Sequence, residues 1–265
     1  MHFISEKRLD DGSLERAFNL GDIPGILWTP ASAPAPLILV GHPGGLPAMY
    51  PRVASRARRS LANGFAAATI ELPGCGDRPR LADAEQARAD LRRALSVGAP
   101  VDDIVDRLVL PLVEAAVPEW RHLLDVLLSL PEISGPVGYS GGLIAIGIRL
   151  AVVESRIAAA GLFAGSFVPR SMFGEARRIT IPLHVLLQWD DESNDRQQAL
   201  NLFDAFGSHE KTLQANMGGH TGVPQFAGED AARFFTRHLM PIGRLRSGAA
   251  RTLTARGPDV APLWS

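Results

Sequence analysis

A glycine-rich serine turn is the first feature of the sequence that could carry chemistry. Residues 138–142 read Gly-Tyr-Ser-Gly-Gly, which fits the pattern G-x-S-x-G. The turn follows an apolar stretch at 135–139 and precedes a helical pattern at 143–154, and this strand–turn–helix context gives the motif its meaning. The glycines permit a turn too sharp for side chains, with the serine hydroxyl on a strained, exposed tip. The pattern predicts Ser140 as a nucleophile and the N–H of Gly141 as a donor to an oxyanion.

A histidine in a glycine-rich loop late in the chain is the candidate base for this serine. His220 lies in the segment 217–222, Met-Gly-Gly-His-Thr-Gly, which follows a short strand-like stretch at 211–215. The glycines leave room for the imidazole to reach over the edge of a sheet. Among the other histidines, His184 falls inside an apolar stretch, which favours a core position. The pattern therefore predicts that His220 removes the proton of Ser140.

The imidazole needs a carboxylate at its other nitrogen, which fixes the tautomer and the orientation of the ring. The segment 188–192 reads Gln-Trp-Asp-Asp-Glu and follows an apolar stretch at 182–188. We predict Asp191 for this role, with Asp190 as the second choice and Glu192 as a distant third. The first carboxylate can instead cap the turn that follows it.

A second glycine-rich loop follows the early apolar stretch at 36–41. Residues 40–45 read Val-Gly-His-Pro-Gly-Gly. In this chemistry a second oxyanion donor comes from the loop after an early strand. Because Pro43 has no N–H, we predict that the N–H of Gly44 is this donor. His42 is expected to brace the loop rather than to act as a base.

Alternating strand and helix patterns predict the scaffold that positions these residues. Apolar runs typical of a parallel sheet covered on both faces occupy 36–41, 65–72, 135–139, 157–163 and 182–188, with a more polar run at 211–215. Helical patterns occupy 50–63, 143–154, 195–206 and 230–239. The alternation predicts an α/β fold with a doubly wound, mostly parallel sheet, preceded by an antiparallel piece at 25–29.

Two segments depart from this alternation. Residues 79–130 hold only helical patterns interrupted by prolines, and two interpretations stay open: helices that cover the sheet, or a cap over a pocket. The segment 241–265 is rich in Arg, Gly, Ala and Pro. We predict that it is a tail beyond a single domain at 1–240.

Composition and charge argue against several classes of protein. The chain has 265 residues, enough to bury a core without a disulfide or a metal. Its 27 basic and 28 acidic residues give a net charge of −1, which favours neither nucleic acid nor an anionic membrane as a partner. The single cysteine, Cys75, excludes an intramolecular disulfide and a Cys-rich zinc site. The sequence shows no signal core and no run of about 18 apolar residues, so we expect a cytoplasmic protein. The predicted chemistry on a serine implies no metal and no cofactor.

Together these motifs resemble the α/β-hydrolase superfamily, and in particular its dienelactone-hydrolase-like branch, over residues 20–240. The chain order of nucleophile, acid and base is the order found in that superfamily. Residues 71–77, Glu-Leu-Pro-Gly-Cys-Gly-Asp, are similar to its D-x-x-G-x-G-x-S loop, although the first and last residues depart from it. Gln188 stands in place of the glycine of the G-x-x-D acid turn. Dienelactone hydrolases carry a cysteine where this chain has Ser140.

The combined interpretation is a serine hydrolase that cleaves an ester-type bond of a small molecule, namely a carboxylester, a lactone or a thioester. Acyl transfer, peptide cleavage and C–C bond hydrolysis stay open, because one fold and one triad host many reactions. A non-catalytic ligand-binding homologue that retains the triad is the alternative from another class. The sequence leaves the substrate open, and an oligomer is compatible with it.

Overall fold

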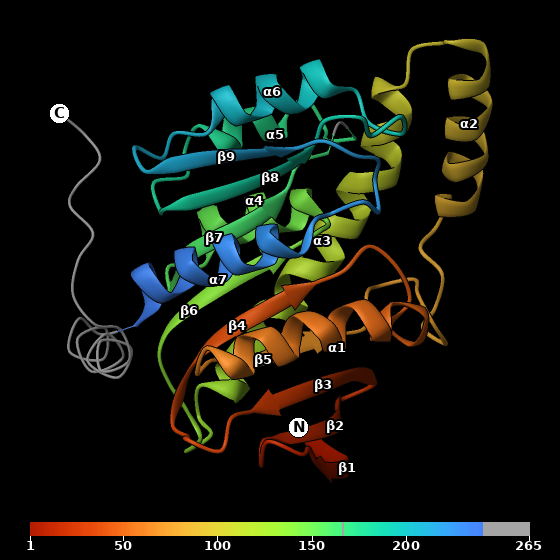
Figure 1. Cartoon of the computed structure of the whole chain (residues 1–265). Helices are drawn as coiled ribbons and strands as arrows, with labels where there is room; N and C mark the ends of the chain where they lie inside the picture. Colours follow the sequence, from red (N-terminus) through yellow and green to blue (C-terminus); the bar gives the residue numbers. More distant parts are fainter. Residues whose placement is uncertain (166, 241–265) are drawn as a thin grey trace, which may run out of the picture.

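A large mixed sheet forms the centre of the molecule (Figure 1). The computed structural model describes residues 1–165 and 167–240, and the predicted tail at 241–265 lies outside the described residues. The strand order is β1-β2-β3-β5-β4-β6-β7-β8-β9. The strands are β1 (His2–Arg8), β2 (Leu14–Leu20), β3 (Ile23–Thr29), β4 (Ala35–Gly41), β5 (Ala66–Ile70), β6 (Ile133–Gly141), β7 (Ile157–Phe163), β8 (Leu183–Gln188) and β9 (Lys211–Asn216). Pairing is antiparallel from β1 to β5 and parallel from β5 to β9.

The parallel strands are apolar on both faces because helices cover both faces. Side chains alternate along β4, where Leu37 and Leu39 join one core cluster while Ile38 and Val40 join the other. All seven residues of β4 are buried. The predicted doubly wound, mostly parallel sheet is therefore confirmed.

The N-terminal part of the sheet is larger than the sequence indicated. The predicted antiparallel piece at 25–29 is the end of β3, which pairs with β2, and β2 in turn pairs with β1. Six of the seven residues of β1 are exposed. An exposed strand lacks the apolar alternation on which a sequence-based prediction depends.

Seven helices in the described chain flank the sheet: α1 (Leu46–Ala62), α2 (Ala84–Val97), α3 (Asp102–Leu127), α4 (Ile144–Val153), α5 (Met172–Ala176), α6 (Arg196–Ala205) and α7 (Gln225–Leu239). Helices α1 and α7 pack on one face, and α3 to α6 pack on the other (Figure 1). Among the described helices, none combines the length and the apolar character that a bilayer crossing requires.

The segment 79–130 forms α2 and α3. Helix α3 packs into the core, with Val113, Leu123 and Leu124 fully buried. Helix α2 packs on α3 and stands away from the sheet (Figure 1). None of the described residues of this segment lines the pocket that contains Ser140. This arrangement favours covering helices over a cap.

Helix α1 begins four residues earlier than predicted, at Leu46. Both carboxylate oxygens of the buried Glu71 lie 2.9 Å from the backbone nitrogen of Leu46. A carboxylate at a helix N-terminus satisfies an N–H that the helix leaves unpaired and favours the helix dipole. The loop that resembles the superfamily motif thus fixes the start of the helix that lines the pocket.

An ion pair between the buried Glu154 and the partly exposed Arg156 predicts how stability depends on pH. Hydrogen bonds from Arg156 lower the pKa of Glu154 from 4.5 to about 2. Because the pKa is lower in the folded state, this carboxylate contributes stability above pH 4.5, and the contribution is lost as the pH falls towards 2. We expect Glu154→Gln to lower the melting temperature at pH 7 and to flatten its dependence on pH between 5 and 2. Thermal unfolding followed by circular dichroism measures both, with the exposed Glu114→Gln as the control; equal pH dependence in wild type and Glu154→Gln would contradict this.

Candidate active site

A pocket of about 790 Å³ lies at the carboxyl ends of the parallel strands, between α1 and α7. In the sheet, β5 lies next to β4 on one side and β6 lies next to β4 on the other, so the order of the strands reverses direction at β4. In open α/β sheets, ligands bind outside the strand ends at such a switch point. Ser140, Asp191 and His220 all line this pocket. Residues from three distant parts of the sequence therefore meet where the topology favours a binding site.

Ser140 is the penultimate residue of β6, where it pairs with Val40 of β4 and Gly161 of β7. The expected strained serine tip is not found, because the only non-glycine residue of the described chain with a positive φ is Asp83. Gly141 takes the left-handed backbone instead, with a φ of +116°. Glycine adopts this conformation without steric cost, so the sharp turn falls one residue after the serine. Helix α4 begins at Ile144, after the turn rather than at Gly141.

Asp191 and His220 form a hydrogen-bonded pair, with 2.7 Å between Asp191 Oδ2 and His220 Nδ1. The Asp191 side chain is 1% exposed, whereas the His220 side chain is 57% exposed. The buried carboxylate thus holds one ring nitrogen while the rest of the imidazole faces the open pocket. Gly218, with a φ of +131°, provides the turn that leads to His220.

The neighbouring acids occupy different places. Asp190 pairs with the loop that carries His220, since its backbone N–H donates to Gly218 O and its carboxylate accepts from Gly218 N at 3.3 Å. Glu192 is exposed, and among the described residues no hydrogen bond or ion pair joins it to His220. Of the three acids considered, the structure brings Asp191 to the imidazole.

Arg56 is the residue of this site that the sequence interpretation missed. From α1, its guanidinium donates to Gly41 O at 2.8 Å, to Ser140 O, and to Ser140 Oγ at 2.9 Å. Among the described hydrogen bonds, none joins Ser140 Oγ to His220. Burial lowers the pKa of Arg56 to about 10, which leaves the side chain cationic at neutral pH. In the sequence, Arg56 lies at helical spacing from the apolar residues Val53 and Ala57. This pattern indicates that Arg56 shares the inward face of the helix.

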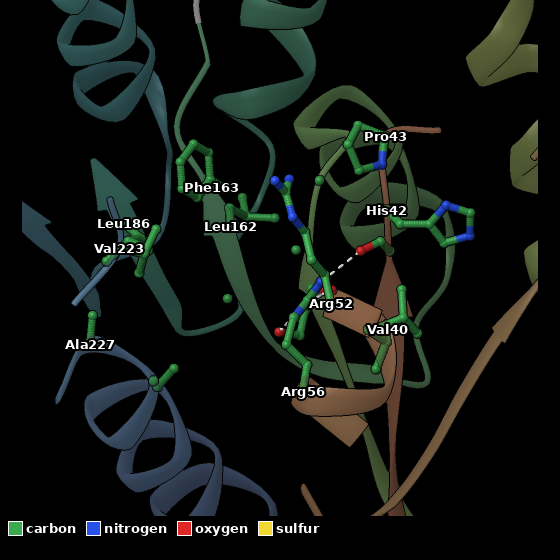
Figure 2. Close-up of a pocket in the computed structure, with 18 of the residues that line it drawn as sticks. Val40, His42, Pro43, Arg52, Arg56, Leu162, Phe163, Leu186, Val223 and Ala227 are labelled. Atoms are coloured by element: carbon green, nitrogen blue, oxygen red, sulfur yellow. Dashed lines mark hydrogen bonds between the residues drawn. The ribbon is translucent and has the colours of Figure 1, made fainter. Parts of the chain in front are cut away.

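Arginines from one face of α1 give the pocket a positive character. Arg52, Arg56 and Arg59 all line it, at positions i, i+4 and i+7 of the helix. Figure 2 shows the side chains of Arg52 and Arg56 extending into the pocket, with Phe163 on another wall. Asp191 is the only described carboxylate in the lining. The pocket therefore carries more positive than negative charge.

The loop after β4 is braced by His42, as its sequence position suggested. The ring is 1% exposed and turned away from the two arginines (Figure 2). Its Nδ1 lies 2.6 Å from Gly44 O and its Nε2 lies 3.0 Å from Ile70 O. Burial lowers the pKa of His42, while the hydrogen bonds to Ile70 O and Gly44 O act in the opposite direction. These contacts make His42 a link between two loops.

The structure does not bring Gly44 into the pocket lining, which includes Gly41, His42 and Pro43. The physical reason is that the Gly44 carbonyl is held by His42 while the chain turns into α1, whose first N–H is fixed by Glu71. Gly141 does line the pocket. Of the two predicted oxyanion donors, Gly141 is thus the one adjacent to the serine and the cavity.

Comparison with known proteins places the fold. No protein-family model matches the sequence, and no curated protein matches it significantly. A solved cold-adapted esterase from an Arctic intertidal metagenomic library is 25% identical, with a TM-score of 0.69 over 90% of this chain and 100% of that chain. Dienelactone hydrolase from Anabaena variabilis is 18% identical, with a TM-score of 0.57 over 89% and 98% of the two chains. Acetyl xylan esterase 1 from Thermoanaerobacterium sp. is 13% identical, with a TM-score of 0.60 over 88% and 87%.

The strand order, the switch point and these neighbours agree on the fold. The chain has the α/β-hydrolase fold. The fold implied by the resemblance is confirmed, and dienelactone hydrolase is among the solved structures that share it.

Proposed function

We propose that the protein is a serine hydrolase that cleaves an ester-type bond of a small molecule through an acyl-enzyme on Ser140. The observation that carries this proposal is the Asp191–His220 pair, which lies on the same pocket as Ser140. The esterases among its structural neighbours support ester chemistry. Carboxylesters, lactones and thioesters are the substrate classes.

In this mechanism the hydroxyl proton of Ser140 passes to Nε2 of His220 while Oγ bonds to the carbonyl carbon of the substrate. Asp191 holds the imidazole in the required tautomer and stabilises the cation that forms. The N–H of Gly141 stabilises the negative carbonyl oxygen, and Gly44 remains a proposed second donor that would have to approach the pocket. His220 then protonates the leaving group, and it next activates the water that releases the acid.

Labelling with an uncharged fluorophosphonate, followed by peptide mapping, tests the proposal. This probe reacts with serines that a base has activated. We expect one adduct, on the peptide that contains Ser140. Hydrolysis of p-nitrophenyl esters and of thioesters of increasing acyl length, with and without an added alcohol or amine acceptor, then separates hydrolysis from acyl transfer. A folded wild-type protein without label and without turnover would overturn the proposal.

One observation favours a second function, the binding of a ligand without turnover. The oxygen of Ser140 accepts a hydrogen bond from Arg56, and no described hydrogen bond connects it to His220. A serine held in this way suits a pocket that binds an acidic ligand through its arginines. Isothermal titration with carboxylate ligands tests this function: micromolar binding without labelling would favour it over hydrolysis.

The positive lining predicts a preference for substrates with a negative charge. Arg52 is exposed, lines the pocket and forms no ion pair within the described chain. We expect Arg52→Gln to raise KM for an anionic ester such as p-nitrophenyl hemisuccinate roughly tenfold, the scale of one charge-assisted hydrogen bond. KM for the neutral p-nitrophenyl butyrate should stay the same. Steady-state kinetics measure both values, with the exposed Arg58→Gln as the control; equal changes for the two esters would show that Arg52 does not recognise charge.

A further inference from the structure

Arg56 occupies an unusual position for a cationic side chain. It lies on the face of α1 that packs on the sheet, next to the buried Val53 and Ala57. Its two terminal nitrogens contact three oxygen atoms, of which two are the carbonyls of Gly41 and Ser140 at the ends of neighbouring strands. The third is Ser140 Oγ, at 2.9 Å from Nη2. The guanidinium therefore contacts the atom that the proposed reaction uses as nucleophile.

Within the described chain, Arg56 has no carboxylate partner. The side chain is partly buried, and withdrawing a cation from water without a counterion costs free energy, because desolvation is not offset by an ion pair. A neutral amide could hold two backbone carbonyls without this cost. The positive charge itself therefore requires an explanation. Stabilisation of negative charge that develops nearby during a reaction is one such explanation.

The residue after the nucleophile lies against this guanidinium. A Cβ added to Gly141 would lie 2.4 Å from Nη2 and 2.6 Å from Nη1 of Arg56, and 2.6 Å from the backbone oxygen of Gly41. The φ of +116° also favours glycine here. Glycine at this position therefore lets the arginine approach the end of β6 closely.

We propose that Arg56 is a further catalytic residue, which stabilises negative charge on Ser140 Oγ as the nucleophile is activated. This inference rests on the proposed function of Ser140. Because Oγ accepts from Arg56, its own hydrogen points elsewhere, which leaves it available for His220. When that proton moves to Nε2, the charge left on Oγ faces a hydrogen-bonded cation. After the Oγ–C bond has formed and the carbonyl electrons have moved to oxygen, the same cation lies near the oxyanion.

The test is a set of variants assayed with the neutral p-nitrophenyl butyrate, so that recognition of substrate charge does not contribute. We expect Arg56→Gln to lower kcat by about 10²-fold with KM nearly unchanged, as for the loss of an oxyanion donor. Arg56→Lys, which keeps the charge, should retain more activity than Arg56→Gln. Arg58→Gln, on the same helix but exposed and outside the pocket, is the matched control and should behave like wild type.

Chemical rescue separates a catalytic role from a structural one. In Arg56→Ala, millimolar methylguanidinium should raise kcat, whereas the same concentration of tetramethylammonium should not. A structural role predicts a loss of kcat that follows the folded fraction measured by circular dichroism, without rescue. That result would overturn the inference, as would a kcat within about threefold of wild type in folded Arg56→Gln. A loss confined to KM for anionic esters would also overturn it and assign Arg56 to substrate binding.

Failure of this inference is distinguishable from failure of the proposed function. If wild type is labelled at Ser140 and hydrolyses esters while Arg56→Gln does the same, only the role of Arg56 is wrong. If folded wild type shows neither labelling nor turnover, the proposed function is wrong, and the role of Arg56 is overturned with it.

Discussion

Replacement of Ser140 by alanine is expected to abolish ester hydrolysis and labelling by the fluorophosphonate. Loss of a serine nucleophile from a triad typically lowers kcat by roughly 10⁶-fold, because residual catalysis comes only from binding and the oxyanion donors. The change removes one partly buried oxygen from the end of β6 and leaves the backbone hydrogen bonds of the strand in place. The melting temperature should therefore change little.

Burst kinetics and intact-protein mass spectrometry measure this effect. Wild type incubated with a slowly hydrolysed p-nitrophenyl ester should gain the mass of one acyl group, and Ser140→Ala should gain none. Ser60→Ala is a suitable control, because Ser60 also lines the pocket and its hydroxyl bonds only to the carbonyl of Arg56. Near-normal turnover in Ser140→Ala would remove this serine from the mechanism.

The second large effect is expected at the triad acid. Asp191→Asn should lower kcat about 10⁴-fold, the effect of a similar substitution in other triads, because an amide can donate to Nδ1 and favour the wrong tautomer. Asp190→Asn should lower kcat much less, since Asp190 contacts the loop through Gly218 rather than the imidazole. The two variants differ by one position in the sequence and remove the same charge.

Parallel kinetics of the two variants, with melting temperatures, measure the difference. The comparison controls for net charge and for damage to the acid turn. A larger loss in Asp190→Asn than in Asp191→Asn would exchange the roles of the two acids. Equal and small losses would show that neither acid orients a catalytic histidine.

The scaffold was largely predictable because its signals are local. The buried parallel strands appear as apolar runs, and the helices between them show helical periodicity. For example, the predicted helix at 195–206 is observed as Arg196–Ala205, with Asp195 as its N-cap. The two N-terminal strands were missed for the opposite reason, since most of their residues are exposed or half-buried and give no clear apolar alternation.

Pairs of residues at the site were predictable only in part. The sequence placed an acid after one strand and a histidine after the next, and the fold brings Asp191 and His220 to hydrogen-bond distance. The choice between Asp191 and Asp190 depends on which side chain the turn directs towards the loop. That direction is a property of the folded backbone.

By itself, the sequence determined the class of fold, the order of the candidate triad along the chain and the glycines that permit the turns. These are consequences of side-chain polarity, periodicity and backbone freedom, which act over a few residues. Only the tertiary structure decided that Ser140 stays in its strand, that Gly44 is held outside the pocket lining and that Arg56 contacts the serine oxygen. These features depend on contacts between segments far apart in the chain. Arg56, 84 positions before Ser140, reaches it because α1 packs on the sheet beside the end of β6.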